Sequence, residues 1–165
     1  MKKILFVILM ALVLFNFTGC EKKEETSETN NTNTEEKTKL TNGYDLSLTE
    51  NSSFDKLEFK YPKNAQISSV ITSMVISLKK NDSEDDLFRV VFGSFYGTST
   101  ESAMEGYTKK GTKKYGNITW DVYEKNGEEF YAICYDYTVD VLGFIINGDV
   151  GNFKEDFLNN IKLNN

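Results

Sequence analysis

Hydrophobic and polar positions divide this 165-residue chain into three sections of different character. Residues 4–15 form an unbroken apolar run, residues 21–39 contain no aromatic or aliphatic side chain, and the remainder mixes apolar and polar positions. An apolar run of about a dozen residues is too short to span a bilayer, which takes roughly 20. A section without apolar side chains cannot bury enough surface to fold. We therefore expect one folded domain at residues 41–165, preceded by a polar tether at residues 20–40 and an N-terminal segment at residues 1–19.

Alternation of apolar and polar residues predicts four strands in the first half of the domain. They are expected at residues 44–48, 57–62, 67–78 and 87–96. The last of these is apolar on both faces, which is typical of a strand at the centre of a sheet. The polar residues 49–53 are interpreted as the hairpin connection between the first two strands.

The hydrophobic period changes after residue 97. Thr98-Ser99-Thr100-Glu101 is a capping-box pattern, which predicts a helix running to about Lys110 and ended by Gly111. Asn126-Gly127 is the strongest hairpin signal of the chain. Around it we expect three strands and then a closing amphipathic helix. The strands are predicted at residues 118–122, 129–139 and 141–146, and the helix at residues 152–163.

This order of elements predicts an α+β fold, in which an antiparallel sheet of about six or seven strands is covered by two helices. Three segments carry a resemblance to a known group: LEFKYP at residues 57–62, ITWDVYEKNGEEFYAICYDY at 118–137 and FKEDFLNNIK at 153–162. Their order and apolar pattern resemble the PsbP/DcrB-like superfamily. The resemblance implies an α/β/α sandwich and a non-enzymatic role. No catalytic signature defines that group, so the resemblance implies no site residue.

The first 20 residues have the organisation of an export signal. Lys2 and Lys3 precede the apolar run, and Phe17-Thr18-Gly19-Cys20 resembles the lipobox of bacterial lipoproteins. The resemblance implies cleavage before Cys20 and a diacylglyceryl group, with fatty acids such as palmitate, on its sulfur. Two acyl chains anchor a protein stably, at about 0.8 kcal/mol per buried CH₂. The alternative is an ordinary secretory signal with an incidental cysteine.

Composition narrows the possible chemistry. The chain has no histidine, which excludes histidine-based triads, HExxH zinc sites and imidazole acid–base catalysis. A net charge of −6 argues against a nucleic-acid partner, because phosphate binding needs a basic surface. With Cys20 lipidated, Cys134 has no intrachain disulfide partner, and no histidine can activate it as a nucleophile. We therefore expect no catalytic residue, no metal site and no cofactor.

A row of tyrosines is the candidate ligand-binding feature. Tyr131, Tyr135 and Tyr137 alternate along a predicted strand, and Tyr123 lies on the preceding strand across the Asn126-Gly127 turn. Aromatic rings in such a row can stack on sugars or hold a peptide. Tyrosine also favours strands in general, and a face covered by a helix would bury the same row as core. The sequence leaves both interpretations open.

Three charged groups have an ordinary explanation beside a functional one. The acidic loop at residues 82–86 suits either calcium or a solvated turn, although it lacks the EF-hand spacing. Four lysines, which can contact anionic headgroups or simply favour a helix C-terminus, stand at positions 109, 110, 113 and 114. Asp121 and Asp136 are a conceivable carboxylate pair for glycoside hydrolysis.

Together these patterns predict a membrane-anchored lipoprotein on the extracytoplasmic side of the cell membrane. Its domain is expected to have a non-catalytic binding or assembly-supporting role toward an envelope protein or a small ligand. Two alternatives remain. One is an envelope hydrolase whose carboxylates meet only in the fold, and the other is a small-ligand carrier that uses the tyrosine-rich sheet face.

Overall fold

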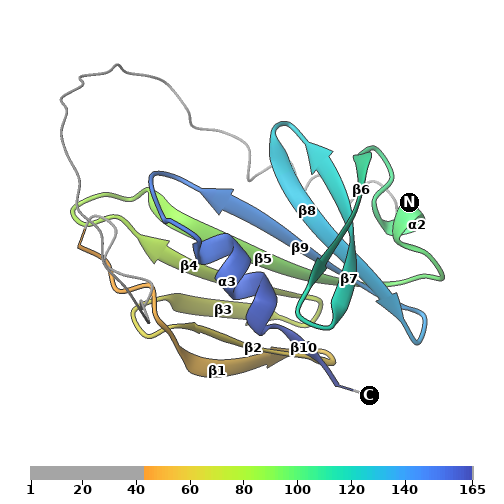
Figure 1. Cartoon of the computed structure of the whole chain (residues 1–165), viewed down its shortest axis with the longest axis horizontal. Helices are drawn as coiled ribbons and strands as arrows, with labels where there is room; N and C mark the ends of the chain where they lie inside the picture. Colours follow the sequence, from red (N-terminus) through yellow and green to blue (C-terminus); the bar gives the residue numbers. More distant parts are fainter. Residues whose placement is uncertain (1–42, 165) are drawn as a thin grey trace, which may run out of the picture. The chain divides into compact units, whose positions relative to one another are not determined.

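The computed structural model describes residues 43–164, which all belong to one compact unit of the chain. The predicted signal peptide, Cys20 and the tether at residues 20–40 lie outside the described residues. Residues 43–164 form two antiparallel sheets and two helices, a mixed α+β fold (Figure 1). Neither helix in this part of the chain is long and apolar enough to cross a membrane.

The main sheet has seven antiparallel strands in the order β3-β4-β5-β9-β8-β7-β6. Their bounds are Gln66–Val70 for β3, Ser73–Lys79 for β4, Asp86–Tyr96 for β5, Thr108–Tyr115 for β6, Ile118–Lys125 for β7, Glu128–Tyr135 for β8 and Thr138–Ile146 for β9. As predicted, the strand that is apolar on both faces, β5, lies inside the sheet, where it pairs with β4 and β9.

A smaller sheet of three strands has the order β1-β2-β10. It consists of β1 (Leu48–Phe54), β2 (Leu57–Pro62) and β10 (Lys162–Leu163). The two described helices are α2 (Thr100–Ala103) and α3 (Phe153–Asn160).

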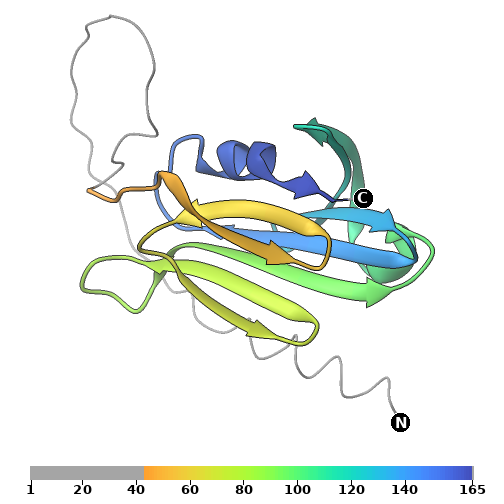
Figure 2. The same cartoon turned by 90° about the horizontal axis from the view of Figure 1, so that it is seen from below.

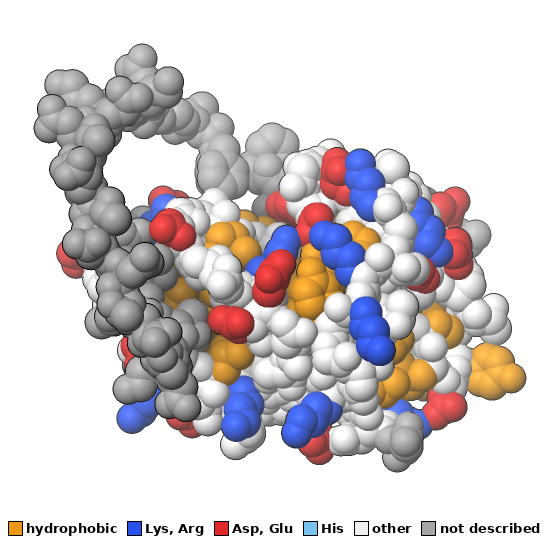
Figure 3. All heavy atoms as spheres, viewed as in Figure 1, with side chains coloured by type: hydrophobic (Ala, Val, Ile, Leu, Met, Phe, Trp, Pro, Cys, Tyr) orange, Lys and Arg blue, Asp and Glu red, His pale blue; other side chains and the backbone are white. Residues whose placement is uncertain are grey.

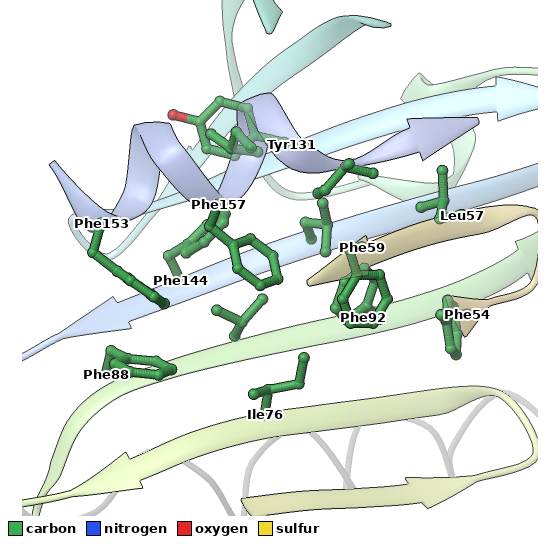
Figure 4. Close-up of a cluster of buried hydrophobic side chains, with 14 of the residues drawn as sticks. Phe54, Leu57, Phe59, Ile76, Phe88, Phe92, Tyr131, Phe144, Phe153 and Phe157 are labelled. Atoms are coloured by element: carbon green, nitrogen blue, oxygen red, sulfur yellow. The ribbon is translucent and has the colours of Figure 1, made fainter. Parts of the chain in front are cut away.

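One face of the main sheet, which we call the deep face, is covered by the small sheet and α3 (Figures 1 and 2). Successive side chains of a strand point to opposite faces, so Phe88 and Phe92 of β5 both point into this layer. Phe92 stacks on Phe59 of β2 with ring centroids 4.5 Å apart, and Phe88 contacts Phe153 of α3 at 4.2 Å (Figure 4). Burying each such ring stabilises the fold by about 1.5–3 kcal/mol.

The opposite face, which we call the shallow face, has a smaller apolar cluster beneath the α2 segment. Its buried members come from the residue after α2 and from β7, β8 and β9, and they are Met104, Tyr123, Ala132, Val139 and Val141. The N-cap of α2 is Ser99, whose side chain accepts a hydrogen bond from the Ser102 backbone, as the capping-box pattern predicts.

Three expectations for the first half of the domain are wrong. The predicted strand at residues 44–48 does not form, since the first strand begins only at Leu48. Residues 49–53 belong to strand β1, because an outer strand needs only backbone pairing on one side and exposes its polar side chains to water. Residues 67–78 are two strands, β3 and β4, joined by a turn at Ile71-Thr72. Neither turn residue has a positive φ, so the turn needs no Gly, Asn or Asp and leaves no signal in the sequence.

The second half differs in its boundaries. The predicted helix to Lys110 ends at Ala103, and the lysine-rich residues after Gly106 form strand β6, because pairing with β7 overrides the local helical pattern. The predicted strand at residues 129–139 is divided by a turn at Asp136-Tyr137. The closing helix ends at Asn160, after which β10 pairs with β2. Asn126-Gly127 does form the predicted tight turn, with φ values of 55° and 81°.

Candidate functional site

The structure distributes the four predicted tyrosines over three places. Tyr131 and Tyr135 point to the deep face, Tyr123 lies on the shallow face, and Tyr137 is in the turn between β8 and β9. Tyr131 and Tyr123 are 0% and 2% exposed, whereas Tyr137 is 73% exposed. The four side chains therefore do not form one continuous surface.

Tyr131 belongs to a polar network that ties β8 to α3. Its hydroxyl donates to Glu129 at 2.7 Å, and Lys154 of α3 donates to the same carboxylate oxygen at 2.7 Å. These bonds, that from Lys154 above all, lower the pKa of Glu129 to about 2, while burial and Glu129 raise the pKa of Tyr131. Lys113 of β6 lies 3.5 Å from the other oxygen of Glu129. This network joins three elements and is structural.

An open groove of about 310 Å³ lies on the shallow face beside α2. Thr100 and Asp121 line it, and the buried Thr100 hydroxyl donates to Asp121 and lies 3.0 Å from the Tyr123 hydroxyl. Lys109 contacts Glu101 at 2.7 Å and Asp121 at 3.1 Å, and these two carboxylates raise its pKa. The polar groups of the groove thus satisfy one another.

The carboxylates considered for hydrolysis are not brought together. Asp121 lies in the groove on β7, whereas Asp136 lies in the β8–β9 turn and pairs with Lys56. Cys134 also lines the groove, where its thiol contacts the Gly97 carbonyl oxygen at 3.7 Å. Within residues 43–164 no three His, Cys, Asp or Glu side chains gather in a way that could hold a metal ion.

The lysine cluster lies on an outer strand rather than at a helix end. Three of its members form ion pairs with acidic residues, Lys109 with Glu101 and Asp121, Lys110 with Glu124 at 2.7 Å, and Lys113 with Glu129. Much of the positive charge of β6 is therefore neutralised within the domain.

A different group of residues stands out at the end of the main sheet where β5 ends and β8 turns into β9. We call it the tyrosine end; it comprises Tyr96, Tyr135, Asp136 and Tyr137 together with the Asp55-Lys56 turn of the small sheet. Tyr96 is 98% exposed, and the Gly97 backbone after it donates to the Tyr137 carbonyl at 2.9 Å. Hydrophobic atoms protrude from the surface at this end (right side of Figure 3).

Two of the three charged groups of the tyrosine end form an ion pair. Lys56 forms an ion pair with Asp136, and its ammonium group lies 5.8 Å from the centre of the Tyr135 ring. The Tyr135 hydroxyl reaches Asp55 at 2.9 Å. Lys56 and Asp136 thus neutralise each other, whereas Asp55 is bonded by an uncharged phenol.

A buried carboxyl lies beneath this end. Asp140 of β9 is 0% exposed, and the Tyr135 hydroxyl bonds to one of its oxygens. Burial raises the pKa of Asp140 to about 6, with Asp55 adding to the rise and Tyr135 and Ser94 opposing it. One phenol hydrogen cannot serve both Asp55 and Asp140. A proton on Asp140 would let its carboxyl donate to the Tyr135 oxygen while the Tyr135 hydroxyl donates to Asp55.

The backbone at Tyr137 is unusual for a large residue. Asp136 and Tyr137 have φ values of 43° and 63°, the same left-handed region used by Asn126 and Gly127 in the preceding turn. An L-residue in this region costs about 1–2 kcal/mol, which glycine avoids. The β8–β9 turn therefore displays an exposed aromatic ring where a glycine would be less strained.

The sequence singled out Tyr135 and Tyr137 as a binding row and Asp136 only as a conceivable hydrolytic carboxylate, and it did not identify the other members of the tyrosine end. Asp55, Lys56 and Tyr96 come from distant parts of the chain, and no spacing pattern connects them. The one available signal was the adjacent Asp136-Tyr137 pair. If the predicted strand at residues 129–139 had been divided at this pair, the pair would have been predicted as a turn.

No family model matches this chain, and no curated protein matches it. Among solved structures, a protein from Bacteroides thetaiotaomicron VPI-5482 is similar, with a TM-score of 0.41 and 9% identity. The match covers 67% of this chain and 46% of that one, so this chain spans less than half the length of the protein it matches. A similarity this small establishes neither a shared fold nor a shared function.

Proposed function

We propose that this protein is a lipoprotein of the cell envelope, anchored through Cys20 on the extracytoplasmic side of the membrane. Its domain has a non-catalytic binding or assembly-supporting role, and the tyrosine end is its contact surface. The partner is an envelope protein that receives the rings of Tyr96 and Tyr137.

The anchor is supported by the sequence. Lys2 and Lys3, the apolar run at residues 4–15 and Phe17-Thr18-Gly19-Cys20 stand in the order of a lipoprotein signal. The polar residues 21–39 then separate Cys20 from the domain. A flexible linker of that length and composition has a reach of roughly 25 Å. Such a tether would let the domain meet partners close to the membrane.

The contact surface is supported above all by Tyr137. Its side chain is 73% exposed and its backbone has a φ of 63°. Backbone strain of this kind concentrates at functional sites, where the strained residue is used. An exposed tyrosine offers a partner both apolar area and a hydroxyl group, and tyrosine is enriched among the residues that dominate binding energy.

The kind of partner follows from the surroundings of the two rings. Lys56 and Asp136 neutralise each other, and Asp55 adds a negative charge that does not attract nucleic acid. The Tyr137 ring projects from a turn and the Tyr96 ring from the end of β5, a shape that suits insertion into pockets of a protein. The complete lack of histidine and the separation of Asp121 from Asp136 support a non-catalytic role.

We further propose that the domain is a PsbP/DcrB-like sandwich. The support is the arrangement of layers, since α3 packs on the deep face of the main antiparallel sheet and the α2 segment packs on the shallow face. The small sheet beside α3 is an addition to the simple sandwich that the sequence predicts.

Labelling with radioactive palmitate tests the anchor. The full chain is expressed in a bacterial host as wild type, Cys20→Ala and Cys134→Ala. We expect label in the wild type and Cys134→Ala and none in Cys20→Ala. Incorporation into Cys20→Ala would refute the anchor, and Cys134→Ala controls for nonspecific effects of removing a thiol.

A co-purification experiment tests the contact surface separately. The tagged wild-type chain, Tyr137→Gly and a double variant Tyr96→Ser/Tyr137→Gly are recovered from solubilised envelopes of the native host, with Asn126→Ser as the matched turn control. We expect one protein to be retained by the wild type and the control and lost stepwise from the two variants. Equal recovery with all four chains would contradict the proposed surface.

A further inference from the structure

We infer that strand β3 is a self-association edge, which pairs antiparallel with β3 of a second copy of this chain. Within residues 43–164, β3 is an outer strand of the main sheet and pairs on one side only, with β4 (Figure 2). All five of its residues are exposed, Val70 to 69% and Ile67 to 37%. The backbone N–H and C=O groups on its free side are a template for a further strand. This inference is independent of binding at the tyrosine end.

The other outer strands are protected in ways that β3 is not. β6, at the opposite edge of the main sheet, carries four lysines and an irregular register between Lys109 and Gly111. β1, the outer strand of the small sheet, carries Glu50 and a register shift beside it. Lysines, other charges and bulges are the features that keep an edge from pairing. Among these long outer strands, β3 alone has a regular register and no charged side chain.

The sequence of β3 identifies the second copy as the fitting partner. An antiparallel pair that uses all five residues must place Ser68 opposite Ser68, Ile67 opposite Ser69 and Gln66 opposite Val70. Each aliphatic side chain then faces a short or uncharged polar one, and no like charges meet. The same self-pairing on β6 would bring lysines against lysines. β3 can therefore pair with a second β3 without any like-charge contact, whereas the irregular register of β6 disfavours the same pairing there.

This pairing closes after two copies. A two-fold contact uses the same surface of both chains. Both β3 edges are therefore paired in the dimer, and neither can bind a third copy. The remaining outer edges of the joined main sheets are the two β6 strands, in which the irregular register between Lys109 and Gly111 disfavours further pairing. The product is a dimer with a continuous sheet rather than an open fibre.

Cysteine crosslinking in membranes tests the contact and its register. The full chain is expressed in a bacterial host as Ser68→Cys, with Thr112→Cys on the exposed β6 edge as matched control and the wild type as background from Cys134. Directly opposed residues in an antiparallel pair have Cα atoms about 4.5–5.5 Å apart, within the range of a disulfide. After mild oxidation we expect a reducible band of twice the chain's mass, at least fivefold stronger for Ser68→Cys than for either control.

Equal band intensities in the three chains would overturn the inference, and so would a Ser68→Cys adduct with a protein of different mass. A second measurement uses light scattering on the detergent-extracted full chain. We expect two copies per particle for the wild type and Thr112→Lys, and at least tenfold weaker self-association for Ser68→Lys, which opposes two ammonium groups at the two-fold axis. Position 68 is exposed, so the substitution leaves the domain folded. A wild type that is monomeric at all concentrations, or a Ser68→Lys chain that stays dimeric, would overturn the inference.

Discussion

The two faces of the main sheet are built from the same strands but are covered differently. On the deep face, the aromatic rings of β2, β5 and α3 interlock beneath a second sheet and a helix. On the shallow face, a small apolar cluster lies beside a polar network of Thr100, Asp121 and Lys109. Apolar burial is the dominant source of folding free energy. The deep face therefore contributes most of the folding free energy. The polar network of the shallow face mainly holds its own side chains in place.

Removing one large side chain from each face gives the sharpest contrast. Phe157 is fully buried between the rings of Phe59 and Phe144, whereas Met104 is buried at the C-terminal end of a four-residue helix. We expect Phe157→Ala to lower the free energy of unfolding by about 3–5 kcal/mol and Met104→Ala by about 2 kcal/mol. Urea denaturation measures both. Equal losses of unfolding free energy in the two variants would contradict the claim that the deep face contributes more to stability than the shallow face.

The polar network of the shallow face is the next target. Thr100→Val keeps the side chain's shape but removes the hydroxyl that donates to Asp121 and contacts Tyr123. Leaving those partners unsatisfied should cost about 1–3 kcal/mol of unfolding free energy. Ser102→Ala is the control, because its hydroxyl bonds only the adjacent turn at Ser99, and should cost less than about 0.5 kcal/mol. A larger loss in the control would refute the structural role of the network.

The buried Asp140 is the polar exception on the deep face, and it makes stability depend on pH. Its pKa is raised to about 6 from 3.8, so the folded state binds a proton more tightly than the unfolded state. Its contribution is therefore present below about pH 4 and is lost as the pH rises through about 6. We expect the free energy of unfolding of the wild type, relative to Asp140→Asn, to increase by about 1–2 kcal/mol between pH 7 and pH 4.

Glu129 gives the opposite sign and serves as an internal control. Its pKa is lowered to about 2 from 4.5, chiefly by the Lys154 hydrogen bond. Its contribution is present above about pH 4.5 and is lost as the pH falls toward 2. Relative to Glu129→Gln, the wild type should therefore lose stability in that lower range. Parallel pH profiles for the two variants would contradict both assignments.

The smallest predicted effect concerns the turn at the tyrosine end, where neither face provides packing. Tyr137→Gly relieves the left-handed strain and removes only an exposed ring. It also raises the conformational entropy of the unfolded chain, which partly offsets the gain. We expect a gain of about 0.5–1 kcal/mol in the free energy of unfolding. Gly127→Ala in the preceding turn, where φ is 81°, should instead lose about 1 kcal/mol. A loss for Tyr137→Gly would mean that its ring contributes to stability.

Much of the fold could be predicted from local signals in the sequence. The strand that is apolar on both faces marks β5 as an inner strand, and Asn126-Gly127 marks the β7–β8 turn, because both signals depend on neighbouring residues alone. The Ile71-Thr72 turn could not be predicted, since its backbone suits any residue. Strand β6 could not be predicted either, because its pairing with β7 is a tertiary effect that outweighs a helical pattern.

The candidate site was only half accessible to sequence reasoning. Tyr137 could be singled out by composition, but its partner surface includes Tyr96, Lys56 and Asp136, which the fold brings together from separate hairpins. Alternation along one long strand placed Tyr131 and Tyr137 on the same face. The turn that divides this strand instead leaves Tyr131 buried and Tyr137 exposed.

The central claim, that an anchored domain presents the tyrosine end to an envelope protein, is tested most directly by photocrosslinking in intact cells of the native host. A photoreactive phenylalanine analogue replaces Tyr137 in the full chain, and the same analogue at Asn126, in the turn at the other end of β8, is the control. The account predicts a discrete light-dependent adduct with one envelope protein at position 137, absent at position 126 and lost when Cys20 is also changed to Ala. No adduct at position 137, or the same adduct at both positions, would contradict it.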